Sequence, residues 1–111
     1  EDDNNLVSME RYDPSTTEWA EETVAPMPSA RKYAGTAVLD GKLYVVGGES
    51  EADGTTSNLV ERYERPATKS WEAVAPMAEA REAHAMAVLV GKLYAMGGYN
   101  GDYLSSVERY D

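Results

Sequence analysis

A long internal repeat is the feature that most constrains how this chain can fold. The segment "VAPMPSARKYAGTAVLDGKLYVVGG" (24–48) aligns without a gap with "VAPMAEAREAHAMAVLVGKLYAMGG" (74–98), and 15 of the 25 aligned positions are identical. A shorter motif occurs three times, as "MERYD" (9–13), "VERYE" (60–64) and "VERYD" (107–111). The period of about 50 residues predicts small supersecondary units, each of which buries its apolar face against a neighbouring unit.

Within one unit, the pattern predicts short antiparallel strands. "AGTAVL" and "KLYVVGG" flank Asp40-Gly41, and Asp-Gly between two apolar runs is a strong hairpin signal because both residues tolerate positive φ. The polar segment 49–58 is typical of a loop, 59–64 alternates apolar and charged residues as a half-buried strand does, and 70–75 is expected to be a fourth strand that ends before Pro76. The expected unit is therefore all-β, with four strands.

Two differences between the copies predict local changes in geometry. Val90-Gly91 replaces Asp40-Gly41. Because a β-branched residue disfavours positive φ, we expect this turn to change type, with only Gly91 at positive φ. The first copy also has two more residues than the second between its Trp and the following "VAPM", which predicts a β-bulge after Trp19.

Together these residues resemble the Kelch repeat, in which a Gly-Gly pair ends the second strand, a Tyr lies in the third and a Trp opens the fourth. The near-consensus wording "ARxxxxxAVLxGKLYxxGG" is most similar to the propeller domains of BTB–Kelch substrate adaptors, and it also fits an engineered or designed sequence. The glycines allow close backbone approach, and the aromatic rings can fill the gap between adjacent sheets. These structural positions are Gly47, Gly48, Gly97, Gly98, Tyr12, Tyr63, Tyr110, Trp19 and Trp71.

The resemblance implies four-stranded antiparallel propeller blades, with two repeats per chain. Residues 6–28 would form the third and fourth strands of a split blade, 34–77 a complete blade, and 84–111 the first three strands of the next blade. The ring is then incomplete unless the chain is oligomeric, because each blade needs neighbours on both flanks. We expect three copies to give six blades, with four copies and eight blades as the alternative. The competing interpretation is a fragment that folds only within a longer parent.

The charge balance narrows the possible partners. Acidic residues outnumber basic ones by 20 to 10, so the net charge is -10. Nucleic acids and anionic membranes are therefore not expected as partners, since both are bound through clustered Lys and Arg. No apolar run is long enough for a membrane span, and no signal peptide pattern is present. The absent initiator Met predicts processing or an engineered boundary, and we expect a cytoplasmic or recombinant soluble protein.

Catalysis is not expected from this residue set. The sequence has no Cys and a single His, His84, which excludes disulfides, thiolate metal sites and a Cys nucleophile. Copper oxidases with a Kelch-type fold combine His, Tyr and Cys ligands, which this chain cannot supply. His84, Ala85 and Met86 depart from the small, Gly-rich strand start of the family, and a structural role is expected for His84. We predict no enzyme activity, no cofactor and no metal.

Two non-enzymatic functions remain. The first is a structural module that self-associates to complete a propeller. The alternative is a substrate-adaptor fragment that binds a protein or peptide on its loop face, since loops on a rigid scaffold commonly carry recognition. By resemblance to the BTB–Kelch adaptors, the partner pocket would be lined by Arg31, Arg81, Tyr99, Ser8 and Ser106. For Arg31 and Arg81 an alternative stays open, in which their side chains bind loop carbonyls and acidic neighbours instead of a partner.

Overall fold

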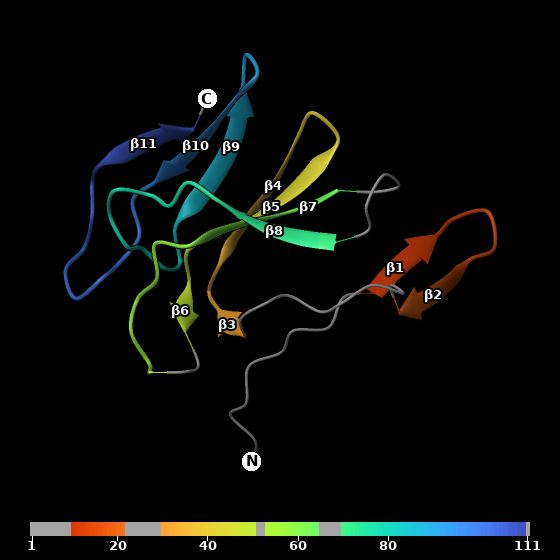
Figure 1. Ribbon diagram of the computed structural model, residues 1–111, viewed down its shortest axis with the longest axis horizontal. Coiled ribbons are helices and arrows are strands. Elements are labelled where there is room, and N and C mark those ends of the chain that lie inside the picture. The colour runs from red at the N-terminus through yellow and green to blue at the C-terminus, as the bar shows by residue number, and fades with distance from the viewer. Residues whose placement is uncertain (1–9, 22–29, 51–52, 65–69, 111) are drawn as a thin grey trace.

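The computed structural model of the chain describes residues 10–21, 30–50, 53–64 and 70–110. Within these residues the regular structure consists of strands arranged in four antiparallel sheets, as Figure 1 shows. The expected all-β architecture is therefore confirmed. None of the described residues belong to a helix long and apolar enough to cross a membrane.

The largest sheet is a complete four-stranded blade. Its strands follow the order β4-β5-β7-β8, so each strand pairs with the next one along the blade. The register pairs Ala37 with Tyr44, Leu43 with Tyr63, and Tyr63 with Trp71. The four strands are β4 (Gly35–Leu39), β5 (Lys42–Val46), β7 (Val60–Glu64) and β8 (Ser70–Val74).

The second sheet repeats this arrangement with three strands. It consists of β9 (Ala85–Leu89), β10 (Lys92–Met96) and β11 (Val107–Tyr110), in the order β11-β10-β9. Leu93 pairs with Tyr110 as Leu43 pairs with Tyr63 in the complete blade. In the described part of the chain no strand pairs with the outer edge of β11, so the position of a fourth strand is open.

Two small sheets complete the described structure. β1 (Glu10–Asp13) and β2 (Glu18–Glu21) form a hairpin that lies apart from the two large sheets (Figure 1), and β3 (Arg31–Lys32) pairs with β6 (Glu49–Ser50). The β1–β2 register is regular, with Tyr12 opposite Trp19. The bulge expected after Trp19 depends on residues beyond Glu21 that lie outside the described ranges.

The hydrophobic core lies between the two large sheets. Successive side chains of a strand point to opposite faces, so one face of the complete blade packs against one face of the three-stranded sheet, with β4 beside β9. The Tyr44 and Tyr110 rings meet across this interface, with centroids 5.6 Å apart. The buried cluster consists of Leu39, Tyr44, Val46, Val60, Met77, Leu93 and Ala95.

The turn between β9 and β10 corrects one expectation. Val90 has φ 50° and Gly91 has φ 71°, almost the same as 54° at Asp40 and 76° at Gly41. The expected change of turn type is therefore wrong. A two-residue loop joins both hairpins, and the turn types that match the right-handed twist of the strands require positive φ at the first loop residue, which is Val90 here. The pairing of the strands thus overrides the preference of Val90, which remains strained.

Candidate partner-binding surfaces

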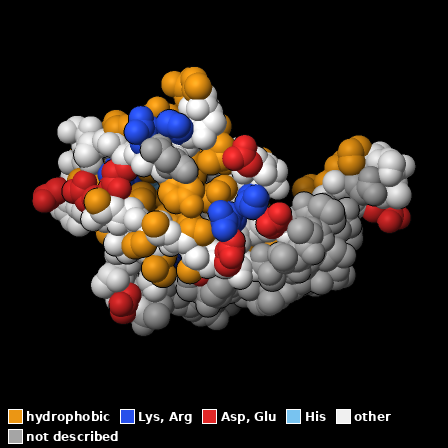
Figure 2. Space-filling view, turned by 45° about the horizontal axis from the view of Figure 1, so that its top comes forward, with side chains coloured by type: hydrophobic (Ala, Val, Ile, Leu, Met, Phe, Trp, Pro, Cys, Tyr) orange, Lys and Arg blue, Asp and Glu red, His pale blue; other side chains and the backbone are white. Residues whose placement is uncertain are grey.

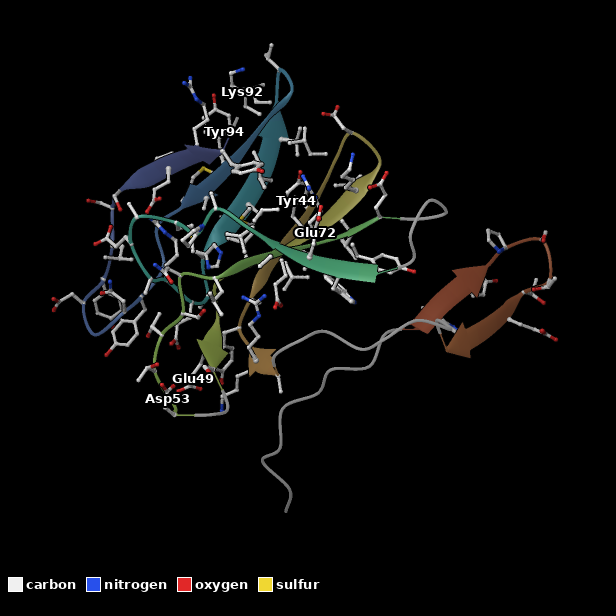
Figure 3. All side chains as sticks on the ribbon, viewed as in Figure 1. Tyr44, Glu49, Asp53, Glu72, Lys92 and Tyr94 are labelled. Carbon is white, nitrogen blue, oxygen red and sulfur yellow. The ribbon has the colours of Figure 1, made fainter. Side chains whose placement is uncertain are left out.

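The two large sheets share a loop end and a hairpin end. Glu49 and Asp53 lie at the loop end, and Lys92 lies at the opposite end (Figure 3). The connections 47–59 and 75–84 are interlocked at the loop end by backbone hydrogen bonds. The Met77 amide donates to the Asn58 carbonyl over 2.9 Å, and the Gly48 amide donates to the Arg81 carbonyl over 2.9 Å. These bonds tie the loops of the complete blade to the segment that leads into the next sheet.

Arg31 is held by its own blade beneath the loop end. Its Nη1 donates to the carbonyls of Gly47 at 2.8 Å and Leu59 at 3.0 Å, and its Nη2 donates to Glu61 Oε1 at 2.6 Å. Both members of the Arg31–Glu61 ion pair are buried. The guanidinium therefore ties the start of the blade to the base of its long loop. Within that loop, the Thr55 amide and hydroxyl donate hydrogen bonds to Asp53 Oδ1. These bonds lower the pKa of the Asp53 carboxyl.

Arg81 repeats this arrangement in the three-stranded sheet. It donates to the Gly97 carbonyl at 2.9 Å, to the Ser106 carbonyl and hydroxyl at 3.1 Å each, and to Glu108 Oε2 at 2.9 Å. Burial acts to raise the pKa of Glu108, but hydrogen bonds from the Ala78 amide, from Arg81 and from the Glu79 amide outweigh it and hold the pKa below its ordinary value. The carboxylate is therefore locked in its charged form.

These contacts place the expected pocket residues in two groups. Arg31 and Arg81 are buried against loop carbonyls and acidic side chains, which is the alternative that the sequence left open. The Ser106 side chain already contacts Arg81 and Glu79, while Ser8 lies outside the described residues. Of the five expected positions, Tyr99 is the one that presents a large exposed side chain. The partner-binding role of these residues stays a prediction.

Exposed tyrosines gather at the loop end. The Tyr99 and Tyr103 rings lie 5.4 Å apart, and Tyr103 is 91% exposed. Tyr33, also exposed, lies at the same end because its carbonyl accepts the Ala83 amide, next to Glu82, which pairs with Tyr99. Sequence reasoning selected Tyr99 but missed Tyr33 and Tyr103. The signal available for Tyr103 is an aromatic residue within the otherwise polar "YNGDY" loop.

The outer face of the three-stranded sheet forms a second surface, which we call the open flank. Its side chains are Ala85, Ala87, Leu89, Tyr94, Met96 and Val107, which share one face by their register. Leu89 is 61% exposed whereas its equivalent Leu39 is 6% exposed, and Val107 is 58% exposed whereas Val60 is 5% exposed. In Figure 3, Tyr44 lies between the two large sheets, whereas its equivalent Tyr94 lies beside the β9–β10 hairpin. An apolar sheet face left uncovered in this way typically marks an interaction site.

His84 sits in the interface between the two large sheets. A Cβ on Gly35 would come within 2.8 Å of its Nε2, and a Cβ on Gly47 within 2.9 Å of its Cε1. Both ring nitrogens are buried, and the described residues provide no hydrogen-bond partner for either. Burial lowers the pKa of His84, the Arg81 charge adds to this effect, and the nearby Val46 backbone opposes it in part. Among the described residues no group of three His, Cys, Asp or Glu side chains could hold a metal ion.

The loop-end arrangement and the repeated sheets agree with the comparison to known families. The model of the Kelch motif matches residues 30–78 and 80–111. The chain belongs to the Kelch-repeat family. Its large sheets are Kelch-type propeller blades, and the described strands do not close a ring.

Individual relatives support the same assignment. Kelch-like protein 23 of Homo sapiens is 40% identical over 63 residues, which are 57% of this chain and 11% of that protein. Kelch-like protein 21 of Homo sapiens is 58% identical over 40 residues, or 36% of this chain and 6% of that protein. The solved structure titled "Structure of YjhT" matches with a TM-score of 0.71 and 30% identity, over 85% of this chain and 29% of that one. The chain thus spans about a tenth of the curated relatives' length.

Proposed function

We propose that this chain is a non-enzymatic Kelch module that associates with further copies of itself to complete a propeller. The observation that carries the proposal is the open flank. Leu89 and Val107 of this flank are exposed, whereas their equivalents Leu39 and Val60 in the complete blade are buried against a neighbouring sheet. Burying apolar surface contributes about 25 cal/mol per Å², so covering this flank with another blade favours association.

The interface inside the chain is a template for the contact between copies. One face of the complete blade, with Leu39 and Tyr44, packs on the face of the next sheet that carries Leu93 and Tyr110. The open flank has the residue pattern of the first face. The opposite face of the complete blade, which carries Leu43 and Tyr63 in register and on which Val38 is exposed, has the pattern of the second.

Joining these two faces between copies gives a head-to-tail contact. A contact of this kind closes a ring when the rotation per copy divides a full turn. With two blades contributed by each copy, three copies would give six blades and four would give eight. The net charge of -10 opposes the association of identical chains, so added salt should strengthen it by screening.

Size-exclusion chromatography with light scattering tests the proposal. Leu89→Asp places a charge in the proposed contact, and we expect it to shift the wild-type oligomer to monomer. Val90→Asp is the matched control, because Val90 is exposed at the adjacent hairpin tip and is not on the flank; it should leave the mass unchanged. A wild-type chain that is folded and monomeric at every concentration would contradict the proposal.

The second candidate function is recognition of a protein or peptide at the loop end. It is supported by the exposed Tyr99–Tyr103 pair on a hydrogen-bonded loop scaffold, since aromatic side chains on rigid supports are frequent binding anchors. In this proposal Tyr99 and Ser106 contact the partner, and Arg31 and Arg81 hold the loops from behind. The acidic chain favours neutral or basic peptides.

A peptide library panned against the chain provides the probes for this second function. For an enriched peptide, Tyr103→Ala should weaken binding about 30-fold, as expected for an aromatic hot spot, while Val90→Asp at the opposite end should have no effect. Calorimetry in which both variants bind like the wild type would exclude the loop end as the binding site.

A further inference from the structure

A groove between the two large sheets extends to the open edge of β11. Its lining is mainly apolar, and the charged residues in it are Glu108 and Arg109. In the view of Figure 2, hydrophobic side chains gather near the centre of one face, so apolar surface remains uncovered outside the core. The residues that line the groove include Val60, Met77, Leu93, Ala95, Glu108 and Tyr110.

The complete blade shows what normally lies beside this position. There, β8 covers the edge of β7, and Trp71 stands opposite Tyr63 with ring centroids 5.3 Å apart. Tyr110 occupies the place of Tyr63 in the second sheet, because both pair with the equivalent Leu of the preceding strand. The groove beside Tyr110 is therefore the place where the indole of a fourth strand would lie.

The β1–β2 hairpin carries an indole in the required arrangement. Tyr12 is opposite Trp19, and their ring centroids are 5.3 Å apart, as in the Tyr63–Trp71 pair. Trp19 is 67% exposed. A Trp on a short strand that pairs only with β1 in the described structure is available to another sheet.

We infer that the groove binds the Trp19 side chain of a second copy, whose β2 pairs antiparallel with the open edge of β11. This inference rests on the proposed self-association and names the segment that enters the contact. β11 already fills the third-strand position, so β2 exchanges its β1 partner for β11. Both partners offer the same Glu-Arg-Tyr sequence, at 10–12 and 108–110, and the exchange therefore replaces each cross-strand pair with one of the same kind.

The register of the exchanged pair can be tested by cross-linking. If Tyr110 takes the place of Tyr12 opposite Trp19, then Arg109 lies opposite Ala20 of the other copy, as Arg11 does within the hairpin. The wild-type sequence has no Cys, so the double variant Ala20→Cys and Arg109→Cys should form an intermolecular disulfide under mild oxidation. The control pairs Ala20→Cys with Arg62→Cys, the equivalent position in the complete blade, where β8 already covers the edge. It should remain uncross-linked, and equal cross-linking of both pairs would overturn the register.

The role of the Trp19 side chain in the contact is tested by Trp fluorescence and by the oligomeric mass in solution. In the Trp71→Phe variant, Trp19 is the only Trp, and its emission should shift to shorter wavelength as the concentration rises into the associated range. Trp19→Ala should weaken association about 30-fold, as loss of a buried aromatic anchor does. Val90→Ala at the exposed hairpin tip serves as the control and should leave association unchanged.

The outcomes of these experiments separate the two proposals. A wild-type chain that stays monomeric contradicts the self-association proposal. A wild-type oligomer that Trp19→Ala leaves intact, with no change in Trp19 emission, overturns only the inference about the groove.

Discussion

The complete blade and the three-stranded sheet are copies of one repeat but have different surroundings. Leu39 and Val60 face a neighbouring sheet and are buried, whereas Leu89 and Val107 face outward and are exposed. The difference does not come from the residues themselves, since each pair has the same residue type. It shows that in a repeat protein a position is buried by the neighbouring unit, and that identical residues contribute differently to stability according to that neighbour.

The first glycine of each Gly-Gly pair shows the same contrast at the backbone. A Cβ on Gly47 would overlap the Arg81 carbonyl oxygen, which belongs to the segment leading into the next sheet. A Cβ on Gly97 would meet the Leu104 carbonyl oxygen at 3.5 Å, an ordinary contact. Both glycines have φ 67°, so backbone strain opposes substitution at both, while a steric clash is added only where the neighbouring unit is present.

The largest difference in unfolding free energy is expected between variants of the two buried Arg residues, Arg31 and Arg81. Arg31→Ala would leave Glu61 buried without its ion-pair partner, and such a loss costs about 3–5 kcal/mol of unfolding free energy. Arg81→Ala should cost less, because Glu108 is more exposed and keeps its hydrogen bonds from the Ala78 and Glu79 amides. Urea denaturation of both variants measures the difference, and equal losses would contradict this ranking.

A smaller but cleaner comparison uses the equivalent leucines. Leu39→Ala removes a buried side chain and should destabilise the chain by about 2–5 kcal/mol. Leu89→Ala should change the unfolding free energy of the dilute chain by no more than about 0.5 kcal/mol. The difference between the destabilisation caused by Leu39→Ala and that caused by Leu89→Ala should narrow at concentrations where copies associate, because Leu89 is then buried too. Thermal unfolding at two concentrations provides the measurement, and a gap that is the same at both would count against an associated flank.

His84 and its equivalent Ala34 predict a pH effect confined to one interface. The folded state lowers the pKa of His84 from its ordinary 6.5, so the unfolded chain takes up the proton at higher pH than the folded chain does. Stability is therefore fully present above pH 6.5 and declines as the pH falls below it. Arg81 is the charged group that acts on the ring, while the uncharged Gly35 and Gly47 lie close to it.

The control for this effect is His84→Gln, which keeps a polar side chain but does not titrate. Its unfolding free energy should stay flat between about pH 7.5 and 5.5, above the range where carboxylates titrate, while that of the wild type falls. If both proteins show the same slope, another group is responsible.

The smallest expected effect separates the two hairpin turns. Val90→Asp should stabilise the chain by about 1 kcal/mol, because Asp tolerates positive φ better than Val. Asp40→Val in the complete blade should have the opposite effect of similar size, since the two turns have nearly the same φ values. Melting temperatures of the two variants should therefore move in opposite directions, and a shift of the same sign in both would contradict the strain assigned to Val90.

The sequence predicted the parts of the fold that depend on local pattern. The apolar runs on either side of Asp40-Gly41 became the β4–β5 hairpin, and the alternation in 59–64 became β7. The Val90 turn was predicted wrongly because the pairing of its flanking strands outweighs the preference of one residue. Local pattern is thus decisive only where tertiary pairing agrees with it.

The candidate sites were less predictable because they depend on distant contacts. Arg31 meets Glu61 thirty residues later in the chain, so its burial could not be separated from an exposed binding role by spacing alone. Tyr33 and Tyr103 were missed because their shared location follows from the loop hydrogen bonds around Glu82 and Ala83. The open flank, in contrast, could be anticipated, since the repeat pattern indicated three strands in 84–111.

Sedimentation equilibrium of the wild-type chain tests the central claim most directly. If copies complete a propeller, the mass at high concentration should be three times the 12.1 kDa of a single chain, with four times as the alternative ring, and Leu89→Asp should return it to the single-chain value. A folded wild-type chain that sediments as a 12.1 kDa monomer throughout the concentration range, at low and high salt, would contradict the account.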